Sequence, residues 1–539
     1  MSENVQKTLR DSAALRWLAL ILLAGAMFCS YIFMDILSPI KDLMWDTKGW
    51  DSTAFGTMQG SETFLNVFVF FLIFAGIILD KMGVRFTAIL SGAVMLIGAS
   101  INWYALTDMF AGSNLEVWFN EHLNYIPGFD ELGVSPFYKG MPASAKFSAI
   151  GFMIFGCGVE MAGITVSRGI VKWFKGREMA LAMGSEMALA RLGVATCMIF
   201  SPMFARLGGE VSVSRSVAFG VVLLMIALIM FIVYAFMDKK LDSQTGEAEE
   251  KDDPFKLSDL GKILTDSGFW LVALLCVLYY SAIFPFQKYA VNMLQCNLVF
   301  HQVDPSSIWA SNTITIIQYV IMLVVAACAF ASNFSKNKVA KYGLMGVAIV
   351  ALVVFCYMGY MRQSAETVFA VFPLLAVGIT PILGNYVDHK GKAATMLVLG
   401  SLLLIACHLT FAFVLPAFKG SEVGGIIVAY ITILVLGASF SLVPASLWPS
   451  VPKLVDEKII GSAYALIFWI QNISLWLFPL LIGKVLDATN KGVTNQDQLD
   501  YTAPLVMLAG LGVAALILGL VLKVVDKKKG LGLKEPNIK

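Results

Sequence analysis

Long apolar runs, separated by short polar segments, follow one another along the whole chain. The first six runs begin near residues 14, 61, 85, 146, 178 and 213. After a longer polar stretch, eight more begin near 267, 306, 340, 366, 393, 423, 459 and 502. Because about 20 residues of helix cross a bilayer core of about 30 Å, each run is long enough to span a membrane. The pattern predicts an all-α polytopic membrane protein with about 14 transmembrane helices.

One polar stretch divides these runs into two groups. Residues 239–265 are rich in charged residues and nearly free of large apolar ones, which is typical of a solvated linker. The predicted organisation is an N-terminal bundle at 1–238, a cytoplasmic linker at 239–265, a C-terminal bundle at 266–526 and a tail at 527–539. The loop at 108–142 carries aromatic and turn residues that suit either a small outer lid or a loop with no role.

Composition agrees with lipid as the solvent. Hydrophobic residues make up 58% of the 539 residues and charged residues 14%, whereas about a quarter of a soluble domain is charged. The net charge of +2 provides no basic field for a nucleic acid. All eight cysteines lie singly in or beside apolar runs, so we expect buried thiols, no metal and no other cofactor. We expect a monomer.

Lys and Arg cluster on alternate loops, and the loops between them are acidic or mixed. Basic loops usually face the cytoplasm, so both termini are predicted to lie there. The first run, of about 24 residues, is longer than the core of a signal peptide and should remain as a span. Because the N-terminal tail has no acidic dileucine signal, the expected location is a bacterial inner membrane.

One motif, Gly-x3-Asp-x2-Gly with flanking bases, occurs in both groups of runs. Its residues are Gly76, Asp80, Lys81, Gly83 and Arg85 in the first group, and Gly384, Asp388, Gly391 and Lys392 in the second. The first glycine lets neighbouring helices approach closely, the aspartate can pair with bases or cap a helix, and the second glycine permits a tight turn. We expect the two copies to form an inner gate.

This double motif resembles the signature of the major facilitator superfamily. The resemblance covers nearly the whole chain and implies two pseudo-symmetric six-helix bundles around a cavity that opens alternately to each side, in a secondary active or facilitative transporter. Counted from the starts of the halves at 14 and 267, Asp388 lies 55 residues deeper than Asp80. That excess equals about two helices and a turn, so we expect an inserted hairpin within 306–365.

Further runs are similar to one branch of that superfamily, the lysosomal dipeptide transporters and their bacterial relatives. These runs are 30–35, 173–176, 190–193, 279–280, 284–286, 447–449, 461–464 and 471–472. In that branch a glutamate of the fourth helix and an arginine of the fifth are implicated in holding the peptide, and the matching residues are Glu160 and Arg191. The chain departs from the branch at Phe152, where an arginine is common, at Glu186, where a neutral amide is usual, and at Lys288.

Few charges lie within the apolar runs, and each is a functional candidate because a charge at mid-bilayer costs about 2.5 to 3.5 kcal/mol. They are Asp35, Glu160, Glu186, Arg191 and Lys288. A dipeptide is a zwitterion, so its site needs an acid for the ammonium and a base for the carboxylate. Glu160 and Arg191 suit these roles, and the alternative is a buried ion pair that joins their two helices.

The other charges have alternatives of their own. Glu186 suits a protonatable coupling group or a neutral buried acid. Asp35 is an ammonium ligand or a wet aspartate near the outer end of its helix. Lys288 follows Pro285, which can open the seventh helix at a cavity. Lys288 and Pro285 are candidates for coupling or gating, unless Lys288 reaches the outer surface.

Aromatic and amide side chains could line a cavity that accepts varied side chains, although packing is the alternative for each. They are Tyr31, Tyr279, Tyr280, Trp448, Tyr464, Gln471 and Asn472. His408 is more typical of a core histidine than of a proton relay.

The sequence therefore predicts a transporter rather than an enzyme, with dipeptides as substrate and protons as a candidate second partner. Uniport and proton symport both remain open. A small organic anion such as a carboxylate is the alternative substrate, held by Arg191 and Lys288. A hydrolase built on Ser439 and His408 lacks the context that a nucleophile needs, and a non-transporting receptor could use the same fold.

Overall fold

The computed structural model describes residues 8–131, 133, 135–175, 177–245, 261, 263–454 and 460–536, and this part of the chain contains helices and no strands. Thirteen of its helices are long and apolar enough to cross a membrane. The prediction of an all-α polytopic membrane protein is confirmed. All eight cysteines are free thiols, and six of them are buried.

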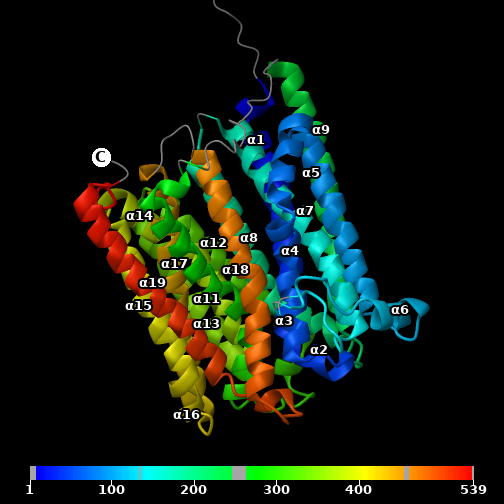
Figure 1. Ribbon diagram of the computed structural model, residues 1–539. Coiled ribbons are helices and arrows are strands. Elements are labelled where there is room, and N and C mark those ends of the chain that lie inside the picture. Colours follow the sequence, from blue (N-terminus) through cyan, green and yellow to red (C-terminus); the bar gives the residue numbers. More distant parts are fainter. Residues whose placement is uncertain are drawn as a thin grey trace, which may run out of the picture.

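The helices form two groups that lie side by side (Figure 1). The first half consists of α1 (Ala13–Met34), α2 (Lys41–Lys48), α3 (Ser52–Gly60), α4 (Phe64–Phe68), α5 (Phe71–Ala105), α6 (Asn114–His122), α7 (Ala143–Phe174), α8 (Met179–Ala205) and α9 (Val213–Thr245). The second half consists of α11 (Ser267–Asn297), α12 (Asn312–Phe334), α13 (Lys338–Met361), α14 (Ala365–Lys390), α15 (Ala393–Leu409), α16 (Leu415–Ala417), α17 (Glu422–Leu447), α18 (Ile460–Thr489) and α19 (Thr502–Lys529). Two short turns, η3 (Ser61–Thr63) and η6 (Trp448–Lys453), matter for the site.

The helix α5 contains two spans that meet at Gly83. The backbone of Gly83 has φ 79° and ψ 169°, a conformation that glycine adopts without steric cost. Before this turn Phe70 stacks on Trp469 of α18, and after it Gly98 packs against Phe155 of α7. The second span therefore consists of α3, η3, α4 and the part of α5 before Gly83. The part of α5 after Gly83 forms the third span. Counted in this way, the described residues contain fourteen spans, as the apolar pattern predicts.

The end of the bundle that holds Gly83 is called the motif end here, and the end that holds the loop at 106–142 is called the loop end. Helix α6 lies within that loop. Helix α9 continues to Thr245 and so extends into the stretch predicted as a linker. Residues 246–260 and 262 of that stretch lie outside the described part of the chain.

The two halves repeat one packing scheme. Helix α1 packs on α8 and α9 as α11 packs on α18 and α19. Likewise, α5 packs on α7 and α9 as α15 packs on α17 and α19. The halves meet where α3 packs on α18 and α14 packs on α8. This correspondence leaves α12 and α13 without a counterpart in the first half, so they are the extra helix pair of the second half.

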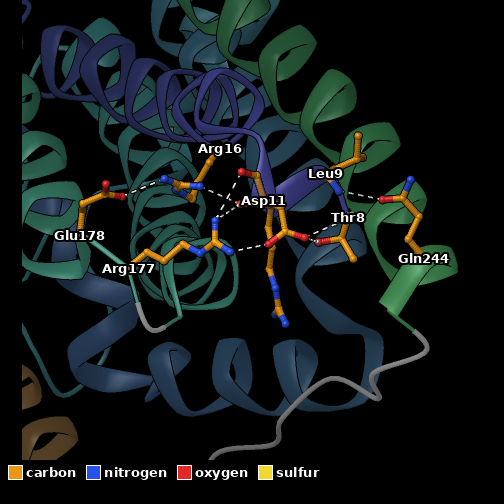
Figure 2. A network of polar contacts seen from close by, with 8 residues as sticks. Thr8, Leu9, Asp11, Arg16, Arg177, Glu178 and Gln244 are labelled. Atoms are coloured by element: carbon orange, nitrogen blue, oxygen red, sulfur yellow. Dashed lines mark hydrogen bonds and ion pairs between the residues drawn. The ribbon is translucent and has the colours of Figure 1, made fainter. Parts of the chain in front are cut away.

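A polar network fixes residues 8–16 at the motif end (Figure 2). Asp11 pairs with Arg177, and Arg16 lies 2.9 Å from Glu178. The backbone N–H of Leu9 donates to a side-chain oxygen at the end of α9 over 2.8 Å. Hydrogen bonds from the backbone and hydroxyl of Thr8, and then from Arg177, lower the pKa of Asp11. The network ties α1, α8 and α9 into one unit.

Candidate functional site

At the loop end the two halves are in backbone contact. A Cβ added to Gly56 would lie 2.8 Å from the carbonyl carbon of Pro479, and one on Gly60 would lie 3.2 Å from that of Trp476. Glycine is therefore needed at both positions for α3 to approach α18 this closely. Asp487 of α18 accepts hydrogen bonds from the first two backbone amides of α3, over 3.2 and 2.7 Å.

A buried ion pair also joins the halves. Lys288 Nζ on α11 lies 2.8 Å from Asp35 Oδ1 at the end of α1 and donates to the Met34 carbonyl over 2.8 Å. The other oxygen of Asp35 accepts a hydrogen bond from Gln287 over 2.8 Å. Asp35 is 1% exposed and Lys288 is 8% exposed. Asp35 is therefore neither a wet aspartate nor open to a substrate ammonium in this structure, and Lys288 does not reach the outer surface.

Two of the alternatives given for residues of α11 are not found in this structure. The helix runs without a break from Ser267 to Asn297 although Pro285 lies inside it, so it does not open there. The hydroxyl of Tyr279 contacts the Leu397 carbonyl and lies 2.6 Å from Ser401 Oγ, both on α15. Tyr279 is fully buried and acts in helix packing rather than as a cavity residue.

The first motif forms ion pairs within its own half. Asp80 lies 2.8 Å from Arg168 at the end of α7, and Arg85 lies 3.0 Å from Asp242 at the end of α9. Lys81 is exposed. These contacts hold the motif-end termini of the first-half helices together.

The second motif contacts the C-terminal segment instead. Gly391 has φ 67°, and the backbone N–H of Lys392 donates to the Lys534 carbonyl over 3.2 Å. Asp388 lies in the last turn of α14. The expected close helix approach at the first glycine is not found in either copy, because a Cβ on Gly76 or Gly384 would meet no atom within 4 Å.

The hydrogen bonds and ring contacts that join the halves lie between Trp469 and the loop end. Nearer the motif end, Tyr386 of α14 and Phe468 of α18 are exposed, as is Met187 of α8. The structure is therefore closed at the loop end.

Glu160 and Arg191 occupy the middle of the bundle, and their partners come from the opposite half. Glu160 Oε1 accepts a hydrogen bond from the Asn472 amide over 3.2 Å. The Arg191 guanidinium lies 5.1 Å from the ring centre of Phe284 and 4.9 Å from that of Phe440. Within the described residues neither charge forms an ion pair, which excludes the alternative of a pair that joins their two helices.

Tyr31 of α1 brings the charges of the first half into one site. Its hydroxyl is within electrostatic range of Arg191, Glu186, Glu160 and Glu62. Gly193, which follows Arg191 by two residues on α8, would place a Cβ 3.3 Å from the Tyr31 Cβ, so α8 packs directly on α1 at this level.

Aromatic side chains of the second half face this site. The ring of Tyr280 lies 5.1 Å from Phe284 and 6.4 Å from Trp448, whose ring lies 6.0 Å from Tyr464. The Tyr464 hydroxyl donates to the Trp448 carbonyl over 3.0 Å. Gln471 Oε1 lies 3.5 Å from a thiol of α11. Because the Phe284 ring also contacts the Arg191 guanidinium, this aromatic wall is continuous with the charged site.

Glu62 is not among the residues predicted from the sequence. The apolar pattern puts the start of the second span near 61, which would place Glu62 at a helix end, whereas the span begins at Ser52. Glu62 is half-buried, and the charges that act on it are Lys288, Asp35 and Glu160. The signal that could have found it is the polar spacing of Gln59, Glu62 and Asn66, which puts three polar side chains on one helix face.

Two residues of the rejected hydrolase hypothesis serve packing. His408 Nε2 lies 3.1 Å from the Ala282 carbonyl and is fully buried, as expected for a core histidine. The Ser439 hydroxyl donates to the Gly400 carbonyl over 2.9 Å and so joins α17 to α15.

Two pseudo-symmetric helical bundles, closed against each other at one end and holding charges between them, define a membrane transporter for small solutes. The family model described as Major Facilitator Superfamily matches residues 23–379, and the chain belongs to this superfamily. It is a transporter and not an enzyme.

Two relatives carry the name lysosomal dipeptide transporter MFSD1. The protein of Homo sapiens is 22% identical over 482 residues, which cover 88% of this chain and 80% of the human protein. The protein of Bos taurus is 24% identical over 346 residues, which cover 63% of this chain and 58% of the bovine protein.

Solved structures of the nucleoside transporter NupG share the fold. The match covers 94% of this chain and 99% of the NupG chain, with a TM-score of 0.59 and 13% identity. A point mutant of NupG gives a TM-score of 0.60 and 12% identity at the same coverage.

Proposed function

We propose that the protein carries dipeptides across the membrane by alternating access. One observation carries the proposal. Glu160 and Arg191, of opposite charge, share a site inside the membrane, and their hydrogen-bond and ring partners among the described residues are neutral. A charge at mid-bilayer costs about 2.5 to 3.5 kcal/mol. Two charges kept there without an ion-pair partner imply a ligand that neutralises both. A zwitterion of peptide length does so, with its ammonium on Glu160 and its carboxylate on Arg191.

The partners of these two charges link binding to movement of the halves. Asn472 and the rings of Phe284 and Phe440 belong to the half opposite Glu160 and Arg191. A dipeptide held by the two charges therefore lies between the halves and changes the contacts across them. This coupling is what alternating access requires, because a ligand moves an equilibrium only through its different affinity for the two states.

The aromatic wall of Tyr280, Trp448 and Tyr464 suits varied side chains, since an aromatic surface makes apolar contact without demanding one shape. The relatives named as dipeptide transporters support the same substrate class. The organic anion alternative loses support, because Lys288 is held by Asp35.

The proposed orientation places the motif end in the cytoplasm. Basic residues gather there, among them Lys81, Arg85, Lys175, Lys392 and Lys527, and basic loops usually stay on the cytoplasmic side. Both termini then lie in the cytoplasm. The names of the relatives place those proteins in lysosomes, so fractionation of the native host tests our proposal of a bacterial inner membrane.

The test is binding of one dipeptide and its two blocked forms, N-acetylated and C-amidated, to purified protein. A charge-assisted hydrogen bond contributes about 1.5 to 3 kcal/mol, so each block should weaken binding by about 10- to 150-fold. In Glu160→Gln the free and the acetylated dipeptide should bind equally well, because the partner of the ammonium is gone. In Arg191→Gln the free and the amidated dipeptide should bind equally well, because the partner of the carboxylate is gone. Glu121→Gln, on the exposed face of α6, is the matched control.

Unchanged affinity for the free dipeptide in Glu160→Gln would refute the zwitterion site. Tighter binding of a dicarboxylate than of the dipeptide would favour the organic anion.

A further inference from the structure

We propose that α6 is an interfacial helix, which lies in the membrane surface at the loop end and anchors the loop at 106–142 to the lipid headgroup region. The partner is a zwitterionic lipid surface, bound through apolar side chains. The proposal goes beyond the transport of a solute. It depends on the membrane-spanning fold, and neither on the identity of the solute nor on the orientation of the protein.

Helix α6 lies at the side of the bundle rather than over its end (Figure 1). The Phe119 ring lies 4.9 Å from that of Phe147, which is one turn inside the start of α7. Leu123, directly after α6, packs in the same apolar cluster as Ile150, which is two turns inside α7. Lys146 Nζ donates to the Phe119 carbonyl over 3.1 Å. Helix α6 is therefore fixed against the side of α7, within its first two turns.

The length of α7 places these turns at the membrane surface. Its 32 residues extend over about 48 Å, whereas the hydrocarbon core is about 30 Å thick. If both ends share the excess equally, each extends about 9 Å beyond the core. Phe147 and Ile150 lie about 6 and about 10 Å from the first residue of α7, which is the boundary between headgroups and hydrocarbon. Interfacial helices bury their apolar faces about 5 to 10 Å into this region.

The surface beside α6 is one that lipid covers. Ile97, Ile101 and Tyr104 of α5 follow one another on one helix face. Ile97 is 55% exposed, as expected of an apolar residue that faces lipid in a membrane span. Tyr104 ends this stripe, and its ring lies 6.0 Å from that of Phe110, which precedes α6. The apolar cluster under α6 therefore continues the lipid-facing surface of the bundle.

The free apolar side of α6 extends the same surface. Leu115, Trp118 and Phe119 share one side of the helix, at spacings of three and four residues. Phe119 is buried against the bundle, whereas Leu115 is 37% exposed and Trp118 is 48% exposed. The other side carries Asn120 and one exposed apolar residue, Val117. Tryptophan is enriched at the membrane surface, because its ring is apolar and its N–H still reaches a hydrogen-bond partner.

The charges of the loop decide which lipid surface suits it. Residues 106–138 contain no Lys or Arg and five acids, which are Asp108, Glu116, Glu121, Asp130 and Glu131. Anionic headgroups would be repelled by these acids. Anchoring therefore relies on the burial of apolar side chains and should occur on purely zwitterionic lipid.

The test compares the two sides of α6 in the full-length protein, reconstituted in phosphatidylcholine liposomes. The partly exposed Cys328 and Cys356 are replaced by Ala. A nitrobenzoxadiazole dye is then attached to Leu115→Cys, to Trp118→Cys or, as the matched control on the opposite side, to Asn120→Cys. Fluorescence quenching is measured with iodide on both sides of the membrane, and separately with a doxyl group on the lipid chains near the headgroup.

Dyes at positions 115 and 118 should lose most of the iodide quenching that is found at position 120, and the doxyl lipid should quench them more strongly. Two positions on the apolar side keep the test valid if one replacement disturbs the helix. Equal iodide quenching on both sides of α6 would overturn the proposal. Protection of positions 115 and 118 from both quenchers would also overturn it, because a second copy of the chain would then cover this side. Doxyl quenching that requires added phosphatidylglycerol would contradict the proposed lipid class.

Discussion

Substitution of Gly56 by Ala should favour the state that is open at the loop end. In the closed loop end the added Cβ would lie 2.8 Å from the carbonyl carbon of Pro479 and closer still to its oxygen. Carbon atoms prefer separations of about 3.5 to 4.0 Å, so α3 and α18 would have to move apart by about 1 Å. Overpacking of this kind costs about 1 to 3 kcal/mol. The population ratio of closed to open loop ends should therefore fall by about 5- to 150-fold.

Electron–electron distances between spin labels at positions 210 and 491 measure this change, because Glu210 and Lys491 are exposed just beyond the loop-end termini of α8 and α18. Initial uptake rates in proteoliposomes measure its effect on turnover. We expect a longer distance and slower uptake in Gly56→Ala. The control is Gly163→Ala on α7, where an added Cβ meets no atom within 4 Å. If Gly56→Ala keeps the label distance and the uptake rate of the parent protein, backbone contact between α3 and α18 is not part of the transport cycle.

Three further outcomes are expected. Arg191→Lys should lower dipeptide affinity by about tenfold or more in a binding assay, because an ammonium cannot bind a carboxylate bidentately; equal affinity would argue against Arg191 as the carboxylate site. Gly391→Ala should expose the C-terminal segment to proteolysis, since its Cβ would lie 2.6 Å from the Glu535 carbonyl carbon at a positive φ, whereas Gly384→Ala should not. Asp11→Asn should lower the melting temperature near neutral pH and lose its effect in acid. The lowered pKa of Asp11 means that its stabilisation is present above the unfolded pKa and is lost as the pH falls through the folded one.

The spans could be predicted from the sequence because their cause is local. Each needs a run of about 20 apolar residues, and such runs are visible without knowledge of the fold. The turn at Gly83 was visible too, since glycine between two apolar runs marks a place where a helix can end. The spacing of the two motifs indicated that the second half holds about two extra helices, but it did not show which helices these are.

The partners of the buried charges could not be predicted. Asp35 and Lys288 are far apart in sequence, and each taken alone was equally consistent with a wet or exposed side chain. Only the packing of the turn Ser38–Ile40, which follows α1, against α11 brings them to 2.8 Å. Tyr279 and Tyr280 are neighbours in sequence, yet helical rotation of about 100° per residue turns one toward α15 and the other toward the aromatic wall.

Uptake of a labelled dipeptide into proteoliposomes, with and without an imposed pH gradient, tests the central claim most directly. The account predicts saturable uptake that excess unlabelled dipeptide inhibits, and that falls in Glu160→Gln and Arg191→Gln but not in Glu121→Gln. Dependence on the gradient would indicate symport with protons, and independence would indicate uniport. Uptake of a dicarboxylate in the absence of any dipeptide uptake would contradict the account.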